Sequence, residues 1–333
     1  MIGSGTYDAM YYFRRGNARG SLKKYDEALV DFSKAIQMNP NLVIAYLYRG
    51  NIYGNLGKYD KAIVDFSQAV KLNPELANAY IGRGITYRIL RHYDEALDDF
   101  SKAIELNPND VLSYLYRGNV HKDLGKYDEA VADFSKAIEL NPNVADAYNN
   151  RGVAYGNLKK YDAAIADFSK ALELNPDDLV AYYNRGNAYD DVGKYDEAIA
   201  DFSKVIEVNP DDEVAYNNRG LAYKNFGKYD EAVADYSKAI EINPYDADAY
   251  NNRGNAYYLL KNYDAAISDF NKAIELNPNL AVAYNNRGLT YSELGKYDAA
   301  VADFSKVIEL NPKHSTAYKN KETAKKKLEE SKK

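Results

Sequence analysis

The sequence predicts an all-α solenoid of nine 34-residue helix-turn-helix repeats followed by a C-terminal helix. The first observation behind this fold class is that all nine prolines, from Pro40 to Pro312, are spaced 34 residues apart. Such internal repetition is typical of solenoids, in which each repeat stacks only on its neighbours. The second observation is that apolar residues recur at intervals of three and four, which indicates two amphipathic helices per repeat and supports no strand.

The repeat boundaries follow from giving each proline the position number 32. Residues 9–314 then form nine repeats, between an N-terminal extension (1–8) and a C-terminal capping helix (315–333). The nine repeats begin at residues 9, 43, 77, 111, 145, 179, 213, 247 and 281.

Each element inside a repeat has its own signal, and we call the two predicted helices helix A and helix B. Position 15 is Gly in five repeats and Lys or Arg in the other four, which predicts that the turn between the helices lies there. Asp at position 18 places a negative charge in the first turn of helix B, where the helix dipole favours it. The Asn-Pro pair at positions 31 and 32 ends helix B, because a residue before proline is pushed out of the helical region.

The composition excludes several classes of function. The chain has no cysteine, which excludes disulfides, thiolate catalysis and Cys-ligated metals. Its three histidines, His92, His121 and His314, do not have the spacing of a metal-binding pair. His121 replaces a tyrosine that seven repeats have at position 11, so we interpret it as a packing substitution. We therefore expect no catalytic residues, no metal and no cofactor.

Charge and hydropathy limit the partners. The net charge is −6, and the acidic residues dominate up to residue 312 whereas the last 21 residues are basic. An acidic body opposes nucleic-acid binding, which requires clustered lysine and arginine to displace counterions from phosphates. No apolar run approaches the ~20 residues of a membrane helix, and residues 1–8 do not read as a secretory signal. We expect a cytoplasmic protein with neither a membrane nor a nucleic-acid partner.

The pattern resembles the tetratricopeptide repeat (TPR) family. In the second repeat the matching residues are Tyr46, Gly50, Tyr53, Ala62, Phe66 and Pro74. The resemblance implies a right-handed superhelix whose concave face is lined by helix A and whose convex face is formed by helix B. Gly at position 8 and Ala at position 20 fit a close crossing of the two helices, since larger side chains there would overpack it.

Two positions depart from the family pattern together. Position 7 is Arg and position 23 is Asp in all nine repeats, where the family usually has apolar or aromatic residues. A joint change to opposite charges predicts that the two side chains touch across the helix pair. The arginines are Arg15, Arg49, Arg83, Arg117, Arg151, Arg185, Arg219, Arg253 and Arg287, and the aspartates are Asp31, Asp65, Asp99, Asp133, Asp167, Asp201, Asp235, Asp269 and Asp303.

The family's groove positions on helix A are 2, 5, 6, 9, 12 and 13, and they divide the candidate peptide-binding residues into two groups. The first four repeats carry an apolar and aromatic group with two amides: Phe13, Leu47, Tyr48, Asn51, Ile81, Leu115, Tyr116 and Asn119. The later repeats carry an amide-rich group: Asn149, Asn150, Tyr183, Asn184, Asn217, Asn218, Asn251, Asn252, Asn285 and Asn286.

The two groups suggest different chemistry. Each asparagine offers one acceptor and two donors, so a column of them could pair with a peptide backbone regardless of its sequence. This column resembles the asparagine ladder of O-linked N-acetylglucosamine transferases, but it is equally compatible with amides that only solvate an exposed face. Contiguous exposed apolar surface usually marks an interaction site, although some of the apolar side chains could instead lie in the seam between neighbouring A helices.

The two ends of the chain differ. Residues 315–333 predict a solvating helix with Ala317, Tyr318, Ala324 and Leu328 facing inward, whereas residues 1–8 predict no polar capping helix. We interpret the protein as a non-catalytic scaffold that binds an extended peptide or a partner helix, as a monomer or with weak self-association through its N-terminal repeat. Two alternatives remain open: a structural adaptor that assembles with itself through that end, and a targeting module excised from a larger enzyme.

Overall fold

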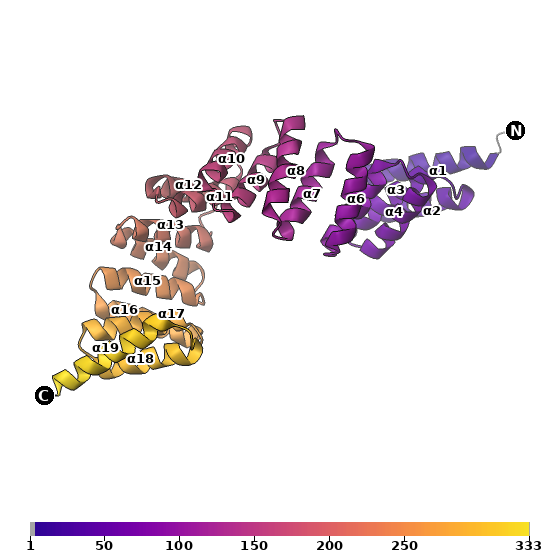
Figure 1. Cartoon of the computed structure of the whole chain (residues 1–333). Coiled ribbons are helices and arrows are strands. Elements are labelled where there is room, and N and C mark those ends of the chain that lie inside the picture. The colour runs from indigo at the N-terminus through magenta and orange to yellow at the C-terminus, as the bar shows by residue number, and fades with distance from the viewer. Residues whose placement is uncertain (1–3, 333) are drawn as a thin grey trace. The chain divides into compact units, whose positions relative to one another are not determined.

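The structure, a computed structural model, describes the backbone of residues 4–332 and the side chains of residues 8–332. Residues 4–332 form nineteen α-helices and no strand (Figure 1). The odd-numbered helices are α1 (Ser4–Ser21), α3 (Val43–Asn55), α5 (Ala77–Ile89), α7 (Val111–Asp123), α9 (Ala145–Asn157), α11 (Leu179–Asp191), α13 (Glu213–Asn225), α15 (Ala247–Leu259), α17 (Ala281–Glu293) and α19 (Ser315–Ser331). The even-numbered helices are α2 (Tyr25–Met38), α4 (Tyr59–Leu72), α6 (Tyr93–Leu106), α8 (Tyr127–Leu140), α10 (Tyr161–Leu174), α12 (Tyr195–Val208), α14 (Tyr229–Ile242), α16 (Tyr263–Leu276) and α18 (Tyr297–Leu310).

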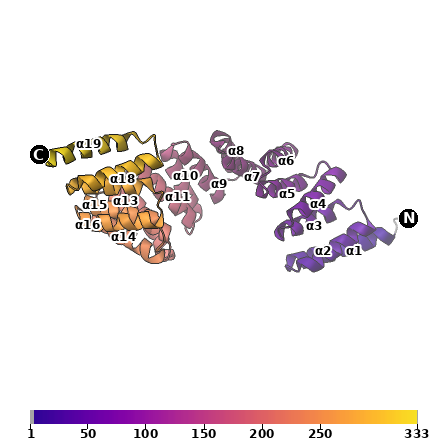
Figure 2. The same cartoon turned by 90° about the horizontal axis from the view of Figure 1, so that it is seen from below.

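The helices pair in chain order to form the predicted solenoid of nine repeats followed by a C-terminal helix. The chain divides into two compact units, Met1–Pro176 and Asp177–Lys333, which we call the N-terminal and C-terminal units. Within each unit, helix A packs on helix B of its own repeat and on helix B of the preceding repeat. Figure 2 shows this succession of helix pairs from a second direction. Among the described residues, no helix is both long enough and apolar enough to cross a membrane.

The predicted turn lies where the sequence places it. Position 15 has a positive φ in all nine repeats, and in five of them it is a glycine with φ between 68° and 85°. The other four are Lys23, Arg91, Lys159 and Lys261, with φ between 58° and 61°. Glycine adopts this left-handed conformation without strain, whereas a residue with a Cβ atom is disfavoured there. Four of the nine turns are therefore built with a strained residue.

The end of helix B is also as predicted. In the second repeat, helix α4 ends at Leu72, and its C-cap Asn73 has an extended backbone with φ −140° and ψ 93°. The following Pro74 disfavours a helical backbone at Asn73. The same C-cap recurs at the end of each of the nine B helices.

The core of each repeat is one aromatic ring that lies against a glycine. The aromatic residue at position 24 is no more than 3% exposed in any repeat. Its ring leaves no room for a side chain at position 8: a Cβ atom built on Gly152 would be 2.7 Å from Cε1 of Phe168. The alanine at position 20 is fully buried in all nine repeats. The packing role predicted for these two positions is confirmed.

The nine predicted Arg–Asp pairs are also confirmed. In every repeat, Nε and Nη2 of the arginine donate hydrogen bonds to the two carboxylate oxygens of the aspartate, at 2.6–2.9 Å. From the second repeat onward the arginine side chains are 18–24% exposed and the aspartates 3–8%. These are bidentate ion pairs that are largely shielded from water.

The arginine also connects neighbouring repeats, which the sequence analysis did not foresee. Nη1 of Arg151 donates to Oγ of Ser135 on helix α8 of the preceding repeat, at 3.0 Å. The Arg151 guanidinium lies between the rings of Tyr148 and Tyr155, at 5.7 and 5.8 Å from their centroids. The hydrogen bond to Asp167 raises the pKa of Arg151, although burial opposes this. One side chain thus joins its own helix A to two B helices.

Both ends of the described part of the chain are helical, and one prediction for them is wrong. Residues 4–8, predicted as part of an extension outside the repeats, continue helix α1, and residues 1–3 lie outside the described part of the chain. Helix α19 packs on helix α18 and buries Ala317 and Ala324, as predicted. The prediction that Tyr318 faces inward is wrong, because this side chain is 48% exposed.

Candidate functional site

In each unit the candidate site is the surface formed by positions 2, 5, 6, 9, 12 and 13 of the A helices, which we call the A-helix face of that unit. Three of its predicted apolar residues lie in the core instead: Phe13, Leu47 and Leu115 are only 7–9% exposed and belong to hydrophobic core clusters. The reason is that position 5 points at the aromatic ring of helix B, as the 5.9 Å separation of the Phe13 and Phe32 rings shows. These three residues anchor helix A and do not offer an open apolar surface.

Other apolar side chains of the N-terminal unit remain exposed on this face. Tyr48 at position 6 is 38% exposed, and Ile89 at position 13 and Leu112 at position 2 are each 51% exposed. Asn51 is exposed, whereas Ile81, Tyr116 and Asn119 are half-buried. The ring of Tyr116 stacks on core residue Phe100 with centroids 5.7 Å apart. Tyr116 therefore has a packing role that sequence reasoning did not assign to it.

The asparagines on this face make polar contacts with one another. In the C-terminal unit, Nδ2 of Asn286 donates to Oδ1 of Asn251 at 3.1 Å, and Nδ2 of Asn218 donates to Oδ1 of Asn187 at 3.3 Å. In the N-terminal unit, Nζ of Lys122 donates to Oδ1 of Asn150 at 2.7 Å. Part of the hydrogen-bonding capacity of the amides is thus occupied by neighbouring repeats.

The remaining predicted residues are partly buried on the same face. Those that are half-buried are Asn149, Tyr183, Asn184, Asn217, Asn252 and Asn285, whereas Asn251 is only 6% exposed. Nδ2 of Asn217 donates to Asp246 at 3.2 Å. The hydroxyl of Tyr183 is buried without a hydrogen-bond partner, and burial raises the pKa of this phenol.

Sequence reasoning missed a recurring contact between positions 12 and 13 of neighbouring A helices, 35 residues apart. In the N-terminal unit, Nε of Arg88 donates to Oδ2 of Asp123 at 2.7 Å. In the C-terminal unit, Nδ2 of Asn225 contacts both carboxylate oxygens of Asp190 at 3.2 Å. Positions 12 and 13 are groove positions of the family, but the sequence of one repeat does not indicate which residue of the next repeat each of them contacts.

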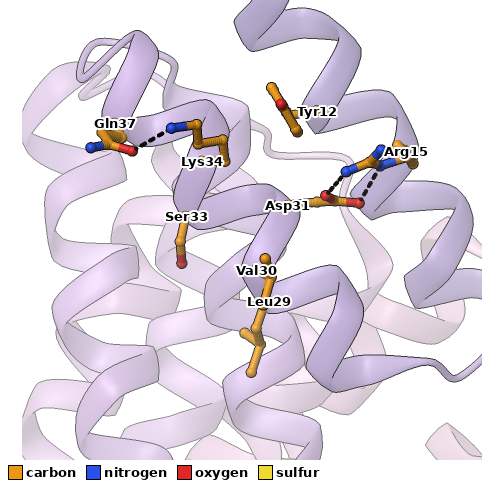
Figure 3. A pocket seen from close by; sticks show the side chains of 8 residues that line it. All are labelled: Tyr12, Arg15, Leu29, Val30, Asp31, Ser33, Lys34 and Gln37. Atoms are coloured by element: carbon orange, nitrogen blue, oxygen red, sulfur yellow. Dashed lines mark hydrogen bonds and ion pairs between the residues drawn. The ribbon is translucent and has the colours of Figure 1, made fainter.

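The first repeat has an open depression of about 640 Å³ (Figure 3). It is lined by Tyr12, Arg15, Leu29, Val30, Asp31, Ser33, Lys34 and Gln37. Arg15 and Asp31 face one another in Figure 3, and the Arg15 side chain is 40% exposed, about twice the value in later repeats. In the second and third repeats Nη1 donates to helix B of the preceding repeat, whereas Nη1 of Arg15 donates to the hydroxyl of Tyr11 at 3.4 Å.

The described part of the chain contains no group of three or more His, Asp or Glu side chains that could hold a metal ion. His121 lies 3.7 Å from Asp133, and its Nδ1 is buried without a partner. Burial lowers the pKa of His121, and the opposing effect of Asp133 does not outweigh it. This histidine fills the position of a core tyrosine, in agreement with its interpretation as a packing substitution.

Comparison with family models identifies the class of protein. The tetratricopeptide repeat model matches residues 9–42, 43–76, 77–110, 145–178, 180–212, 247–280 and 281–314. Two further models of the same repeat match residues 118–159 and 226–261, and residues 100–132 and 202–234. The chain belongs to the tetratricopeptide repeat family, whose members are in general non-catalytic scaffolds for protein–protein interaction.

Solved structures agree with this assignment. The crystal structure of YrrB, described as a TPR protein with an unusual peptide-binding site, is 29% identical with a TM-score of 0.50, over 56% of this chain and 97% of YrrB. A tetratricopeptide repeat protein from Parabacteroides merdae is 23% identical with a TM-score of 0.59, over 74% of this chain and 98% of that protein. The Cut9-Hcn1 hetero-tetramer of the APC/C matches with 16% identity and a TM-score of 0.55, over 95% of this chain and 76% of that one. No curated protein matches the sequence.

Proposed function

We propose that the A-helix face binds an extended peptide or a helix of a partner protein, and that the protein acts as a non-catalytic scaffold. The observation that carries the proposal is the exposure of Tyr48, Ile89 and Leu112, three large apolar side chains on one face of the N-terminal unit. Large apolar side chains that stay exposed on one face favour a binding surface. The peptide-binding site described for YrrB supports the same class of ligand.

The amide-rich C-terminal unit is proposed to hold the backbone of the same kind of ligand. Asparagine pairs with peptide groups through both donors and its acceptor. Each such hydrogen bond contributes only about 0.5–1.5 kcal/mol because water competes for both groups. Buried apolar and aromatic anchors contribute about 2 kcal/mol or more. We therefore assign selectivity to the apolar side chains and sequence-tolerant binding to the amides.

The test uses substitutions that copy other repeats, so that the fold is retained. Asn stands at position 6 in the fifth repeat, at position 13 in the second and at position 2 in the third. The test variant is therefore Tyr48→Asn with Ile89→Asn and Leu112→Asn. The control is Val64→Ala: Val64 is 67% exposed on helix B, and several repeats have Ala at its position.

A peptide selected from a random library against the full chain is the probe, and its affinity is measured by calorimetry. We expect the triple variant to lose at least tenfold in affinity and Val64→Ala to bind as the parent does. Equal binding by the parent and the triple variant would place the ligand elsewhere and refute the proposal.

Self-association through the first repeat is a second candidate, and one observation favours it. Tyr11 at position 3 is 58% exposed and Leu22 at position 14 is 70% exposed, whereas position 3 is buried in every later repeat. Native mass spectrometry of the parent and of Tyr11→Ala with Leu22→Ala tests it. A parent that is monomeric at tens of micromolar would eliminate this candidate.

A further inference from the structure

The B helices of the first two repeats, α2 and α4, differ from the other seven B helices along one stripe of their surface. The stripe consists of positions 19, 22, 26 and 29 of the repeat. These positions lie on one side of an α-helix because they are spaced by three and four residues. We call this side of helices α2 and α4 the B-helix surface. Both helices belong to the N-terminal unit, and helix α3 packs on both of them.

The first difference is apolar. Position 22 is Val30 in helix α2 and Val64 in helix α4, and each of these side chains is 67% exposed. The seven later repeats have Ala, Ser or Asp at this position. The fold therefore does not require a large apolar residue there. Exposed valines at the same place on two successive B helices favour contact with another molecule.

The second difference is a missing ion pair. In the third to ninth repeats, the lysine at position 26 pairs with the glutamate at position 29, with N–O distances of 2.6–2.9 Å. In helix α2 the glutamate is replaced by Gln37, whose amide oxygen accepts a hydrogen bond from Nζ of Lys34 at 3.0 Å (Figure 3). In helix α4 the two positions are Gln68 and Lys71. The B-helix surface thus lacks the carboxylate that neutralises this lysine elsewhere.

The third difference is a lysine at position 19 of the second repeat. This residue is Lys61, where five repeats have Glu and three have Ala. Lys61 is exposed, and its Nζ lies 5.7 Å from the centroid of the Tyr53 ring. At the same position of helix α2, Glu27 is already paired with Arg19 at 3.2 Å. The three lysines of the surface have no ion pair within residues 8–332.

The B-helix surface is hollowed at both helices. The depression of about 640 Å³ in the first repeat has Val30 and Lys34 in its wall. A second depression of about 240 Å³ is lined by Arg49, Tyr53, Asp60, Lys61, Val64 and Asp65. A hydrogen bond of 3.0 Å joins the two linings, from Nη1 of Arg49 to Oγ of Ser33. Each depression therefore combines an exposed valine with a lysine that no carboxylate neutralises.

We propose that the B-helix surface binds an acidic segment of a partner protein. The segment places one apolar side chain in each depression, against Val30 and Val64. Its carboxylates pair with Lys34, Lys61 and Lys71, because charge-assisted hydrogen bonds between ammonium and carboxylate groups are stronger than neutral ones. The surface lies on the B helices and not on the A-helix face. The inference therefore goes beyond the proposed function and does not depend on it.

The probe is a peptide selected from a random library for binding to the full chain and against binding to a variant whose B-helix surface copies the later repeats. This variant carries Val30→Ala, Val64→Ala, Lys61→Glu and Lys71→Glu, and each new residue occurs at the same position in at least five other repeats. The variant should therefore fold, and its urea midpoint checks this. We expect the selected peptides to be rich in Asp and Glu beside large apolar residues.

Calorimetry on one selected peptide then separates the apolar contacts from the charges. We expect the fourfold variant to lose at least about tenfold in affinity. Val30→Ala with Val64→Ala should lose about threefold or more, and Lys61→Glu with Lys71→Glu should do the same. Added salt should weaken binding to the parent because it screens exposed charges.

The matched control for charge is Lys136→Glu with Lys170→Glu. It changes the net charge by the same amount on helices α8 and α10 of the same unit. We expect it to change the affinity by less than about twofold. A loss equal to that of the Lys61 and Lys71 substitutions would mean that only the overall charge matters, and would overturn the proposal.

Reciprocal variants distinguish this surface from the A-helix face. The variant with Tyr48→Asn, Ile89→Asn and Leu112→Asn should bind the selected peptide as the parent does. Val64→Ala should weaken this peptide and leave a peptide bound to the A-helix face unaffected. A loss in the A-helix variant would place the peptide on the other face and refute the inference, without bearing on the proposed function.

Two further results would overturn the inference. If no peptide survives the selection, or if the survivors are not acidic, the B-helix surface does not bind such a segment. If native mass spectrometry shows a parent dimer that the fourfold variant dissociates, the occupant is a second copy of the chain and not a partner protein. The proposed function survives both results, because its own peptide is tested with the A-helix variant.

Discussion

The Arg–Asp pairs make a quantitative prediction for the fifth repeat. Asp167 accepts hydrogen bonds of 2.7 and 2.8 Å from Arg151, and its side chain is 8% exposed. In Asp167→Ala the Arg151 side chain, which is 18% exposed in the parent, keeps Ser135 as its remaining acceptor. Two lost bonds to a charged group at about 1.5–3 kcal/mol each agree with the ~3–5 kcal/mol expected for stranding one member of a buried pair. We expect Asp167→Ala to destabilise the protein by that amount.

The assay is urea unfolding of the full chain followed by circular dichroism. Because solenoid repeats unfold in part independently, hydrogen exchange of helices α9 and α10 should accompany it. Asp162→Ala is the control: this exposed aspartate lies in the first turn of the same helix B, so its loss should cost less than about 1 kcal/mol. Arg151→Leu combined with Asp167→Tyr should recover much of the loss, since it removes both charges. An Asp167→Ala midpoint equal to that of the parent would refute the reasoning.

Four further substitutions, which make three predictions, follow from the packing and the turns, and each is measured by urea unfolding. Gly152→Ala should cost about 1–3 kcal/mol because the added Cβ meets Phe168, whereas Gly156→Ala in the same helix meets nothing within 4 Å and should stabilise it by up to about 1 kcal/mol. Lys159→Gly should stabilise by about 0.5–1 kcal/mol because φ is 58° at this turn. His121→Tyr should remove a loss of stability that the parent shows on acidification below about pH 6.5.

The direction in which pH changes the stability through His121 follows from the burial of this side chain. Burial lowers its pKa in the folded state below the value of about 6.5 in the unfolded chain, so the unfolded chain binds more protons on acidification. The full stability is present above pH 6.5 and is lost as the pH falls toward the folded-state pKa. The groups that act on it are Asp133, Arg117, Glu129 and Lys126. A pH profile that is the same for the parent and His121→Tyr would show that this histidine is solvated.

The predictions for the two glycines and for Lys159 can each be contradicted by the same unfolding measurements. If Gly152→Ala and Gly156→Ala shift the midpoint by the same amount, the close approach of the Phe168 ring does not limit the size of the residue at position 8. If Lys159→Gly destabilises, the entropy that glycine gains in the unfolded chain exceeds the strain of the lysine turn.

The repeat made much of this architecture readable from the sequence. Nine copies of one pattern show which positions are constant, and Arg at position 7 and Asp at position 23 could be matched because both depart from the family pattern in all nine repeats. Glycine at position 8 and the turn at position 15 were readable for the same reason, because each depends on local backbone geometry and on the contact between two helices of one repeat.

The tertiary structure decided which side chains of helix A are open to a ligand. Position 5 was assigned to a groove, but Phe13, Leu47 and Leu115 lie against the core. The side chains of helix A are divided among contacts with its own helix B, contacts with the preceding helix B and solvent. The angle between the helices determines which side chains each of the three receives. A linear pattern of apolar residues does not contain that angle.

The tertiary structure also decided every contact between repeats. The bond from Arg151 to Ser135 and the contact of Asp190 with Asn225 join residues in different repeats, so their geometry depends on how one repeat is rotated on the next. The sequence determined the repeats and the interactions inside each repeat, because these interactions are local and are repeated nine times. The rotation between neighbouring repeats, and with it the contact of Asp190 with Asn225, arises only when the repeats stack.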